Sequence, residues 1–330
     1  MTTSPGSVAI TATDLVKEYP GGVRALDGVT FEVGEGEVFA LLGPNGAGKT
    51  TTVRILTTLS QPTSGTGRVA GLDVVRDQAR VRKAIGVVSQ HSGVDANATG
   101  RENLVLQGRF FGLGGRSLNR RVDELLAMVG LADAAKRIAG TYSGGMSRRL
   151  DIAIGLIHRP QVLFLDEPTT GLDPEVRAAM WDEIRRLAAG EGLTILLTTH
   201  YLEEADRLAG RLAILDRGRV VTLGTPEALK ADLRGDAIAL ELRNGSGEAE
   251  IRAALAATPG LDDIRFEDRT VHLRVAAGAT ALPGVLSALD GRGIAVAAAT
   301  VARPSLDDVY LRHTGRSFAA AERTPQETAK

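Results

Sequence analysis

The sequence predicts an α/β protein with a mixed or parallel sheet at its core, followed by a smaller α+β domain. Three short apolar runs that end in glycine or polar residues are typical of strands buried on both faces of a parallel sheet. Near the C-terminus, strand-like and helix-like patterns follow the order β-α-β-β-α-β, which is ferredoxin-like. A chain of 330 residues is long enough for both domains.

The composition excludes several classes of function. A formal net charge of −1 argues against binding nucleic acid through a large positive field. There are no cysteines, so disulfides, thiolate metal sites and cysteine nucleophiles are excluded. No apolar run approaches the roughly 20 residues of a membrane helix, and the first residues do not resemble a signal peptide. We therefore expect a protein that is made and kept in the cytoplasm.

A glycine-rich turn follows the first apolar run, Val38 to Leu42. Gly43, Gly48, Lys49 and Thr50 fit the pattern G-x-x-x-x-G-K-[ST], and a helical pattern comes next. In such a loop the backbone N–H groups converge on phosphate oxygens, the lysine reaches the outer phosphates and the hydroxyl binds Mg²⁺. A chance glycine-rich turn is the alternative, but it does not explain the strand before and the helix after the pattern.

The second apolar run, Val162 to Leu165, ends at two adjacent acids. We expect Asp166 to hold Mg²⁺ through water, and Glu167 to polarise a water for attack on the γ-phosphate. Adjacent acids at a strand end are often only a solvated turn. The phosphate-binding pattern earlier in the chain favours the catalytic interpretation.

The third apolar run, Thr194 to Thr199, places His200 at its carboxyl end. The carboxyl ends of parallel strands meet at one edge of a sheet, where ligands bind. We therefore expect His200 to contact the γ-phosphate or the attacking water. A cap for the following helix is the alternative role for this histidine.

The stretch TYSGGMSRRL, Thr141 to Leu150, begins a predicted helix and contains two residues that lower helix stability. Ser143 is a good N-cap, whereas Gly144 and Gly145 each cost roughly 1 kcal/mol relative to alanine inside a helix. This cost suggests that something approaches the backbone closely. The helical spacing continues to a stop at Pro160.

Taken in order, these motifs resemble the nucleotide-binding subunit of ATP-binding cassette (ABC) transporters across roughly residues 6–225. The resemblance implies that the chain is an ATP hydrolase that uses ATP and Mg²⁺. It assigns catalysis to Glu167, His200 and Lys49, and metal binding to Thr50, Gln90 and Asp166. It assigns ATP binding to Tyr19, Gly43, Pro44, Asn45, Gly46, Ala47, Gly48, Lys49, Thr50, Thr51, Gln90, Ser143, Gly144, Gly145 and Asp173.

The resemblance also implies a dimer. In this family two cassettes close head to tail, and the serine-glycine segment of one copy faces the ATP of the other, where a side chain on glycine would hold the second subunit off. The sequence has one phosphate-loop pattern, so a second copy is needed to complete each site. Tyr142 and Met146 depart from the leucine and glutamine that the family most often has there, and we expect this to cost at most about tenfold in affinity.

The domain organisation follows from the same patterns. We expect an ATPase domain over residues 1–235, with a helical subdomain at about 91–158 in which Thr99 and Glu102 have capping-box spacing. The resemblance implies that this subdomain receives a multi-span membrane permease, which would place the protein peripherally on the cytoplasmic side of the cell membrane. A self-contained helical insert is the alternative. We expect the small domain over residues 236–316, with a strand turn at Asp268-Arg269, and a disordered tail over 317–330.

The closing segment RPSLDDVYLRHTGR, Arg303 to Arg316, resembles the daunorubicin/doxorubicin-resistance (drug efflux) branch of the family, as does Met146. A helix packing through Leu306, Val309 and Leu311 is a compatible structural role. The function that this resemblance implies is to power export of a hydrophobic, antibiotic-like molecule through the permease. The alternative is a soluble ABC ATPase acting on the ribosome or DNA.

Overall fold

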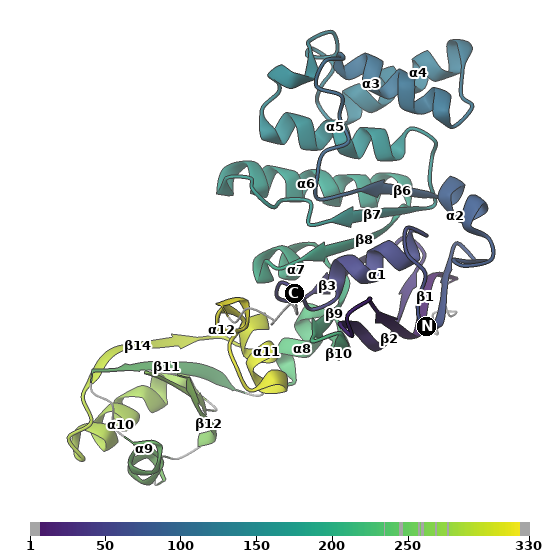
Figure 1. Cartoon of the computed structure of the whole chain (residues 1–330). Coiled ribbons are helices and arrows are strands. Elements are labelled where there is room, and N and C mark those ends of the chain that lie inside the picture. Colours follow the sequence, from purple (N-terminus) through teal and green to yellow (C-terminus); the bar gives the residue numbers. More distant parts are fainter. Residues whose placement is uncertain are drawn as a thin grey trace, which may run out of the picture. The chain divides into compact units, whose positions relative to one another are not determined.

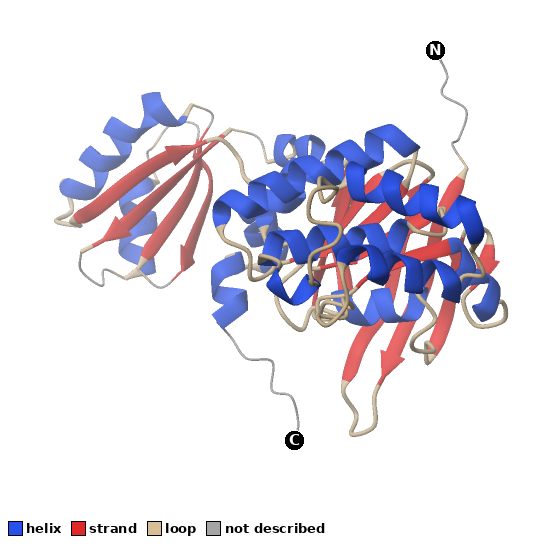
Figure 2. Cartoon of the chain, turned by 90° about the horizontal axis from the view of Figure 1, so that it is seen from above, coloured by secondary structure: helices blue, strands red, loops and turns tan. Residues whose placement is uncertain are grey.

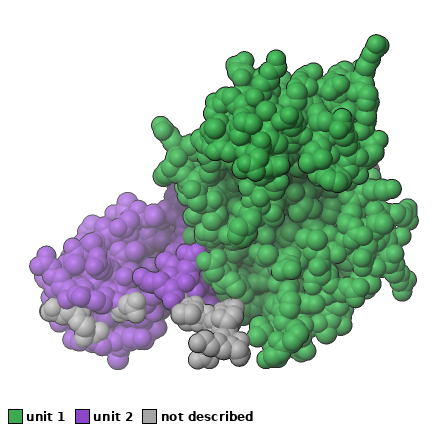
Figure 3. Space-filling model, turned by 45° about the horizontal axis from the view of Figure 1, so that its top comes forward, with its two compact units in different colours: residues 1–223, 325–330 green, residues 224–324 purple. Residues whose placement is uncertain are grey.

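The computed structural model describes residues 7–323 except 234, 244–246, 257, 259, 260, 268 and 276. The chain divides into two compact units, residues 1–223 with 325–330 and residues 224–324 (Figure 3). The sequence places the boundary later, after residue 235. The difference is the segment containing helix α8 (Pro226–Ala231), which contacts α11 (Leu306–Thr314) of the second unit.

The first unit is built on a six-stranded sheet in the order β10-β9-β3-β8-β7-β6. Strands β9, β3, β8, β7 and β6 pair in parallel. Each of the three apolar runs of the sequence forms one of these strands, as predicted. The bounds are β3 Val38–Leu42, β6 Ile85–Val88, β7 Val162–Asp166, β8 Thr194–Thr199, β9 Arg211–Asp216 and β10 Arg219–Gly224.

The strand register aligns the ends of the three central strands. Leu42 of β3 pairs with Thr199 of β8, and Asp166 of β7 pairs with Thr198. The residues that follow these strands therefore lie at one edge of the sheet.

A second, antiparallel sheet completes the core of the first unit. Its order is β2-β1-β4-β5, with β1 Val8–Glu18, β2 Arg24–Gly34, β4 Ser64–Val69 and β5 Leu72–Asp73. Side chains from both sheets and from helix α1 (Lys49–Leu56) form one hydrophobic core, in which Phe31 stacks on Phe39 with ring centroids 5.3 Å apart. Val53, Ile55 and Leu56 belong to this core, which therefore holds the helix that follows the glycine-rich turn.

Helices α3, α4 and α5 pack on one another and lie together in the first unit (Figure 1). The capping box predicted at Thr99 and Glu102 is present at the start of α3. Helix α5 begins after Ser143, as predicted, and ends at Leu156, shortly before Pro160. The helices of this unit are α1, α2 Gln78–Ala84, α3 Gly100–Phe110, α4 Gly115–Met128, α5 Gly144–Leu156, α6 Pro174–Glu191 and α7 Leu202–Leu208, with a 3-10 turn at Ala139–Thr141.

The second unit has the predicted β-α-β-β-α-β order. Its antiparallel sheet has the strand order β12-β13-β11-β14, which is the ferredoxin-like arrangement. Helices α9 and α10 share a hydrophobic core with one face of this sheet, and helices flank strands in both units (Figure 2). The bounds are β11 Asp236–Leu242, α9 Glu248–Leu255, β12 Leu261–Glu267, β13 Thr270–Val275, α10 Gly278–Asp290 and β14 Val296–Ala302. Asp268, at the expected strand turn, lies outside the described residues.

The closing segment forms helix α11, and Leu306, Val309 and Leu311 are buried as the packing role predicted. The expectation of a disordered tail is wrong for residues 318–323, which form helix α12 (Phe318–Arg323). Phe318 is buried and packs edge-on against Tyr310, with ring centroids 5.0 Å apart. Ala321 is also buried, and the N–H of Phe318 donates to Asp307 Oδ1 at 2.8 Å, so these contacts together hold the helix. Residues 324–330 lie outside the described residues.

No helix in the described part of the chain is both long and apolar enough to cross a membrane.

Candidate active site

The glycine-rich turn between β3 and α1 depends on two glycines that no other residue can replace without displacement of the backbone. A Cβ on Gly43 would lie 2.4 Å from the carbonyl oxygen of Leu215. Gly48 has a φ of 104°, and a Cβ there would lie 2.6 Å from Leu26 Cδ2. The turn therefore keeps bare backbone N–H groups at the N-terminus of α1, where the helix dipole favours an anion.

Lys49, the first residue of α1, has its charge held inside the turn. Its side chain is 4% exposed, and Nζ donates to the carbonyl oxygens of Gly43 at 2.7 Å and Pro44 at 3.1 Å. The same Nζ lies 3.4 Å from Oε1 of Glu167. This ammonium group is thus shared between the phosphate-binding turn and the end of β7.

Asp166 joins two strands and one helix at the edge of the sheet. Its Oδ1 accepts a hydrogen bond of 2.6 Å from Thr198 Oγ1 and one of 3.3 Å from Thr50 Oγ1. Thr50 and Asp166 are 116 residues apart in the sequence, and the fold brings together these two of the three residues that were predicted to bind a metal ion.

Glu167 has a left-handed backbone, with a φ of 49°. A non-glycine residue in this conformation costs about 1–3 kcal/mol and persists where its surroundings hold it. Its N–H donates to the carbonyl oxygen and to Oγ1 of Thr198, at 3.2 and 3.0 Å. Its Oε2 accepts a hydrogen bond of 3.2 Å from Thr170 Oγ1. These contacts aim the carboxylate back toward Lys49.

His200 follows β8 and lies beside the same carboxylate, with 3.3 Å between Nδ1 and Glu167 Oε2. Burial raises the pKa of Glu167, but the contact with His200 and the charge of Lys49 outweigh it, and the pKa falls to about 2. Glu167 is therefore ionised at neutral pH. It can accept a hydrogen bond from a water molecule or from a protonated neighbour.

The structure brings five of the predicted residues together at one edge of the sheet. They are Lys49, Thr50, Asp166, Glu167 and His200. Gly43 and Pro44 of the predicted phosphate turn contact Lys49 directly. Three further predicted positions make other contacts or are exposed. Tyr19 follows β1 with Lys17 Nζ 5.1 Å above its ring, and Gln90 is exposed two residues after β6. Asp173 caps its own helix, α6, by accepting from the N–H of Val176 at 3.0 Å.

The serine-glycine segment at the start of α5 places its two glycines in different surroundings. Ser143 is the N-cap, and its Oγ accepts the N–H of Met146 at 3.3 Å. Gly144 is exposed, and a Cβ there would only touch Leu172 at 3.4 Å. Gly145 is buried, and a Cβ there would lie 2.5 Å from Val176 Cγ1 of the same chain. The requirement for glycine at this second position therefore arises from packing within the chain.

Two residues of the site were not assigned a role from the sequence. Thr198 forms hydrogen bonds with both Asp166 and Glu167. The sequence feature that could have indicated this role is a polar residue inside an otherwise apolar, buried strand. Arg148 of α5 is buried and donates to the carbonyl oxygen of Glu167 at 3.4 Å. Its signal is a charged residue on the buried face of a helix.

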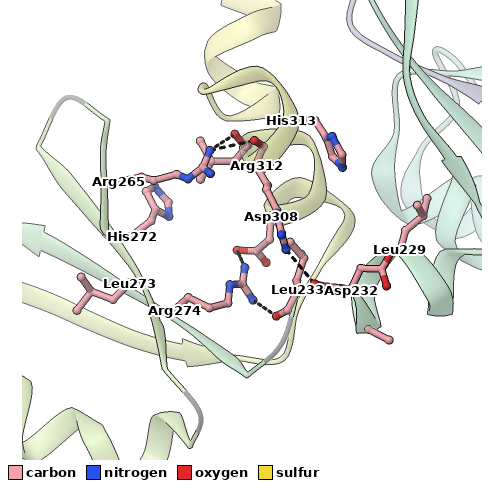
Figure 4. A pocket seen from close by; sticks show the side chains of 12 residues that line it. Leu229, Asp232, Leu233, Arg265, His272, Leu273, Arg274, Asp308, Arg312 and His313 are labelled. Carbon is pink, nitrogen blue, oxygen red and sulfur yellow. Dashed lines mark hydrogen bonds and ion pairs between the residues drawn. The ribbon is translucent and has the colours of Figure 1, made fainter. Parts of the chain in front are cut away.

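A separate cavity of about 840 Å³ lies in the second unit, among α8, α11 and strands β12 and β13 (Figure 4). Its arginines are engaged with the protein. Arg265 donates to the carbonyl oxygen of Leu311 at 2.8 Å, Arg312 donates to that of Asp232 at 2.8 Å, and Arg274 lies 3.1 Å from the Asp308 carboxylate. These contacts tie α11 to the sheet and to the C-terminal end of α8.

A phosphate-binding turn joined to an acidic strand end and a histidine defines a P-loop nucleotide hydrolase. The model of the family described as ABC transporter matches residues 26–170, and that described as ATP-binding protein DrrA1-3-like, C-terminal domain, matches residues 224–314. The chain belongs to the ABC transporter family and is an ATP-binding, ATP-hydrolysing protein of that class. Members of this family act as dimers with a membrane permease.

Several relatives match almost the whole chain. Daunorubicin resistance ATP-binding protein DrrA2 of Streptomyces coeruleorubidus is 48% identical, over 93% of this chain and 95% of the relative. Daunorubicin/doxorubicin resistance ATP-binding protein DrrA of Streptomyces peucetius is 43% identical, over 100% and 98%. Nod factor export ATP-binding protein I of Paraburkholderia xenovorans (strain LB400) is 40% identical, over 92% and 97%.

A solved dimeric ATP-binding cassette, described as a post-hydrolysis state bound to ADP and phosphate, is 26% identical with a TM-score of 0.60. The match covers 66% of this chain and 98% of that chain.

Proposed function

We propose that this chain powers the export of a hydrophobic, antibiotic-like small molecule through a separate membrane permease. The observation that carries the proposal is the group of residues that the parallel sheet assembles: Lys49, Thr50, Asp166, Glu167 and His200. The names of the relatives, which refer to drug resistance and to export, support an exporter over a soluble ATPase acting on the ribosome or DNA.

In this proposal the ATP phosphates lie over the turn Gly43 to Thr51, with Tyr19 against the adenine ring. Backbone N–H groups and the N-terminus of α1 bind the phosphate oxygens. Lys49 exchanges its contact with Glu167 for one with the outer phosphates, because a phosphate carries more negative charge than a single carboxylate.

The oxygen donors at the sheet edge fit Mg²⁺. Thr50 and Asp166 already lie within hydrogen-bond distance, and Mg²⁺ prefers a few protein oxygens together with water and phosphate oxygens. We include Gln90 as a further ligand. Bound Mg²⁺ would neutralise charge on the transferring phosphoryl group.

Glu167 orients the attacking water in this proposal. His200 contacts one oxygen of the same carboxylate, with 3.3 Å between Nδ1 and Oε2. The remaining contacts come from a second copy of the chain arranged head to tail. Ser143, Gly144 and Gly145 of that copy would meet the γ-phosphate, and its Asp173 would lie at the dimer seam. The description of a solved cassette as dimeric supports the pairing of two copies.

The helical subdomain at about 91–158 is the proposed contact with the permease, which would hold the protein peripherally on the cytoplasmic side of the cell membrane. Exposed apolar side chains of α3 support this assignment: Leu106 is 50% exposed and Phe110 is 77% exposed.

The test is accumulation of daunorubicin, a fluorescent probe of the proposed substrate class, in cells that express the chain together with its permease. We expect less accumulation than in cells expressing the Lys49→Ala variant, whose site lacks the phosphate-binding ammonium. Equal accumulation for a panel of hydrophobic antibiotics would refute export of this class. Purification of the chain with ribosomes and never with a membrane protein would favour the soluble alternative.

A further inference from the structure

Arg148 is a charged residue buried in the first unit, on the face of α5 that points into the protein. Its relative exposure is 7%, and each nitrogen of its guanidinium donates to a backbone carbonyl group. The carboxylate of Asp151, three residues further along α5, lies 4.0 Å from one terminal nitrogen. Nε donates to Pro168 at 2.8 Å, and one terminal nitrogen donates to Ser89 at 2.6 Å. The other terminal nitrogen donates to Asp166 at 3.2 Å and to Glu167 at 3.4 Å. The planar guanidinium presents its donors in a fixed fork, which suits several acceptors at once.

Three of these carbonyls belong to consecutive residues, Asp166 to Pro168, immediately after β7. They converge on one cation because the chain turns at Glu167, whose φ of 49° is left-handed. A non-glycine residue keeps such a conformation only where its surroundings hold it. Arg148 holds the backbone on one side of this turn, and the opposite side is bonded to Thr198.

The same face of α5 holds a second loop, which contains Gln90. Besides the bond from Arg148 to Ser89, the Oδ1 atom of Asp151 accepts the N–H of Gly93 at 3.0 Å. The residues on either side of Gln90 are therefore fixed to α5. A displacement of this helix would move the Gln90 loop and the Glu167 turn together.

We infer that Arg148 is a positioning residue that couples the two ATP sites of the dimer. This inference rests on the proposed function, in which the N-terminus of α5 meets the ATP held by the other copy. Arg148 lies five residues after Ser143, which is about 7.5 Å along the helix. ATP bound to the other copy would thus set the position of α5, and Arg148 would transmit that position to Glu167 in its own chain.

The test compares Arg148→Met and Arg148→Lys in the full chain with the wild type and with Arg120→Met. Methionine keeps an unbranched side chain that can fill part of the space but is shorter and has no donors, and lysine keeps the charge but not the fork. The control residue, Arg120, lies on α4 with a side chain that is 78% exposed. For each protein the measurements are ATP affinity without Mg²⁺, kcat, KM and the Hill coefficient of hydrolysis.

We expect Arg148→Met to bind ATP within about twofold of the wild type, because the phosphate turn is unchanged. Its kcat should fall about 100-fold, since a small misplacement of a catalytic group has an effect of this size. Its Hill coefficient should fall to 1, while Arg148→Lys lies between this variant and the wild type and Arg120→Met is unchanged. If Arg148 had a purely structural role, Arg148→Met would be less stable. Its kcat and Hill coefficient would then not fall while its ATP affinity stays unchanged.

A wild-type kcat and Hill coefficient in a folded Arg148→Met protein would overturn the inference. Circular dichroism shows whether that variant folds, and if it does not, the same two readouts in Arg148→Lys decide. Wild-type protein that hydrolyses ATP with a Hill coefficient of 1 would also overturn it, because no coupling would exist. The proposed function fails separately, if the wild type neither hydrolyses ATP nor dimerises with it.

Discussion

The substitution Glu167→Gln tests the centre of the site, because it removes one charge and keeps the size of the side chain. The carboxylate lies 3.4 Å from Lys49 Nζ and 3.3 Å from His200 Nδ1. Its pKa falls from 4.5 to about 2, and one pKa unit corresponds to about 1.4 kcal/mol. The surroundings thus favour the ionised form over the protonated form by about 3 kcal/mol, a preference that an uncharged amide cannot use.

We expect the variant to lose hydrolysis and to keep ATP binding. An amide is a much weaker acceptor for the proton of an attacking water, and loss of a general base typically costs 10²- to 10⁴-fold in rate. Lys49 retains its bonds to Gly43 and Pro44, so the phosphate turn remains organised. With hydrolysis blocked, ATP should hold two copies of the chain together.

The assays are phosphate release with Mg²⁺-ATP, equilibrium binding of ATP and the molar mass in solution with and without ATP. Glu203→Gln is the matched control, since this residue lies on α7 and its side chain is exposed. A kcat for Glu167→Gln within threefold of the wild type would refute the assignment of Glu167 as the residue that activates water. Failure to bind ATP would refute the claim that the phosphate turn is independent of this carboxylate.

Three further substitutions test the packing and the dimer. Gly145→Ala should lower the free energy of unfolding, measured by chemical denaturation, by about 1–3 kcal/mol, because its Cβ would lie 2.5 Å from Val176. The free energy of unfolding of Gly144→Ala should be close to that of the wild type. Gly144→Asp should bind ATP normally but lose about tenfold or more of its turnover, because it places a carboxylate against the phosphate of the other copy; normal turnover would contradict the head-to-tail arrangement. Phe318→Ala should destabilise the second unit by about 3–5 kcal/mol, since this ring is buried, and an unchanged denaturation midpoint would show that α12 adds nothing.

The central sheet was predictable because strands buried on both faces have an almost continuous apolar sequence. The run Val162 to Leu165 could be recognised without any partner, and the polar residues after it had to lie at the carboxyl edge. The meeting of Thr50 with Asp166 followed from this rule, although no local pattern links two residues so far apart. The small domain was predictable for a related reason, since residues of β11 and β13 alternate between a buried face and a more exposed one.

The features that the sequence did not predict depend on a specific partner elsewhere in the chain. Gly145 must be glycine because Val176 of α6 faces it, and neither residue indicates the other in the sequence. Arg148 donates to carbonyl groups, which every residue has, so these acceptors cannot be recognised from side-chain chemistry. Its ion pair with Asp151, at 4.0 Å, is the contact that the sequence spacing could suggest. Phe318 anchors α12 through Tyr310, and an isolated aromatic residue in a polar segment does not reveal such a contact.

The electrostatics of Glu167 lead to a last prediction, about pH. With a pKa of about 2, this carboxylate is ionised but is a weak base, because Lys49 and His200 stabilise its charge. A bound γ-phosphate would attract Lys49 and add negative charge nearby, and both changes raise the pKa of a carboxylate. ATP would therefore make Glu167 a stronger base at the moment when one is needed.

The pH profiles of kcat/KM and kcat distinguish the free site from the site with ATP bound. The acid limb of kcat/KM reports the free enzyme, and that of kcat reports the ATP complex. Activity requires the ionised carboxylate, so each constant falls as the pH drops through the corresponding pKa. We expect the acid limb of kcat to lie at higher pH than that of kcat/KM, and coincident limbs in the wild type would refute the argument. The Glu203→Gln control should show the same separation as the wild type, because its charge is exposed and lies outside the contacts that shift Glu167.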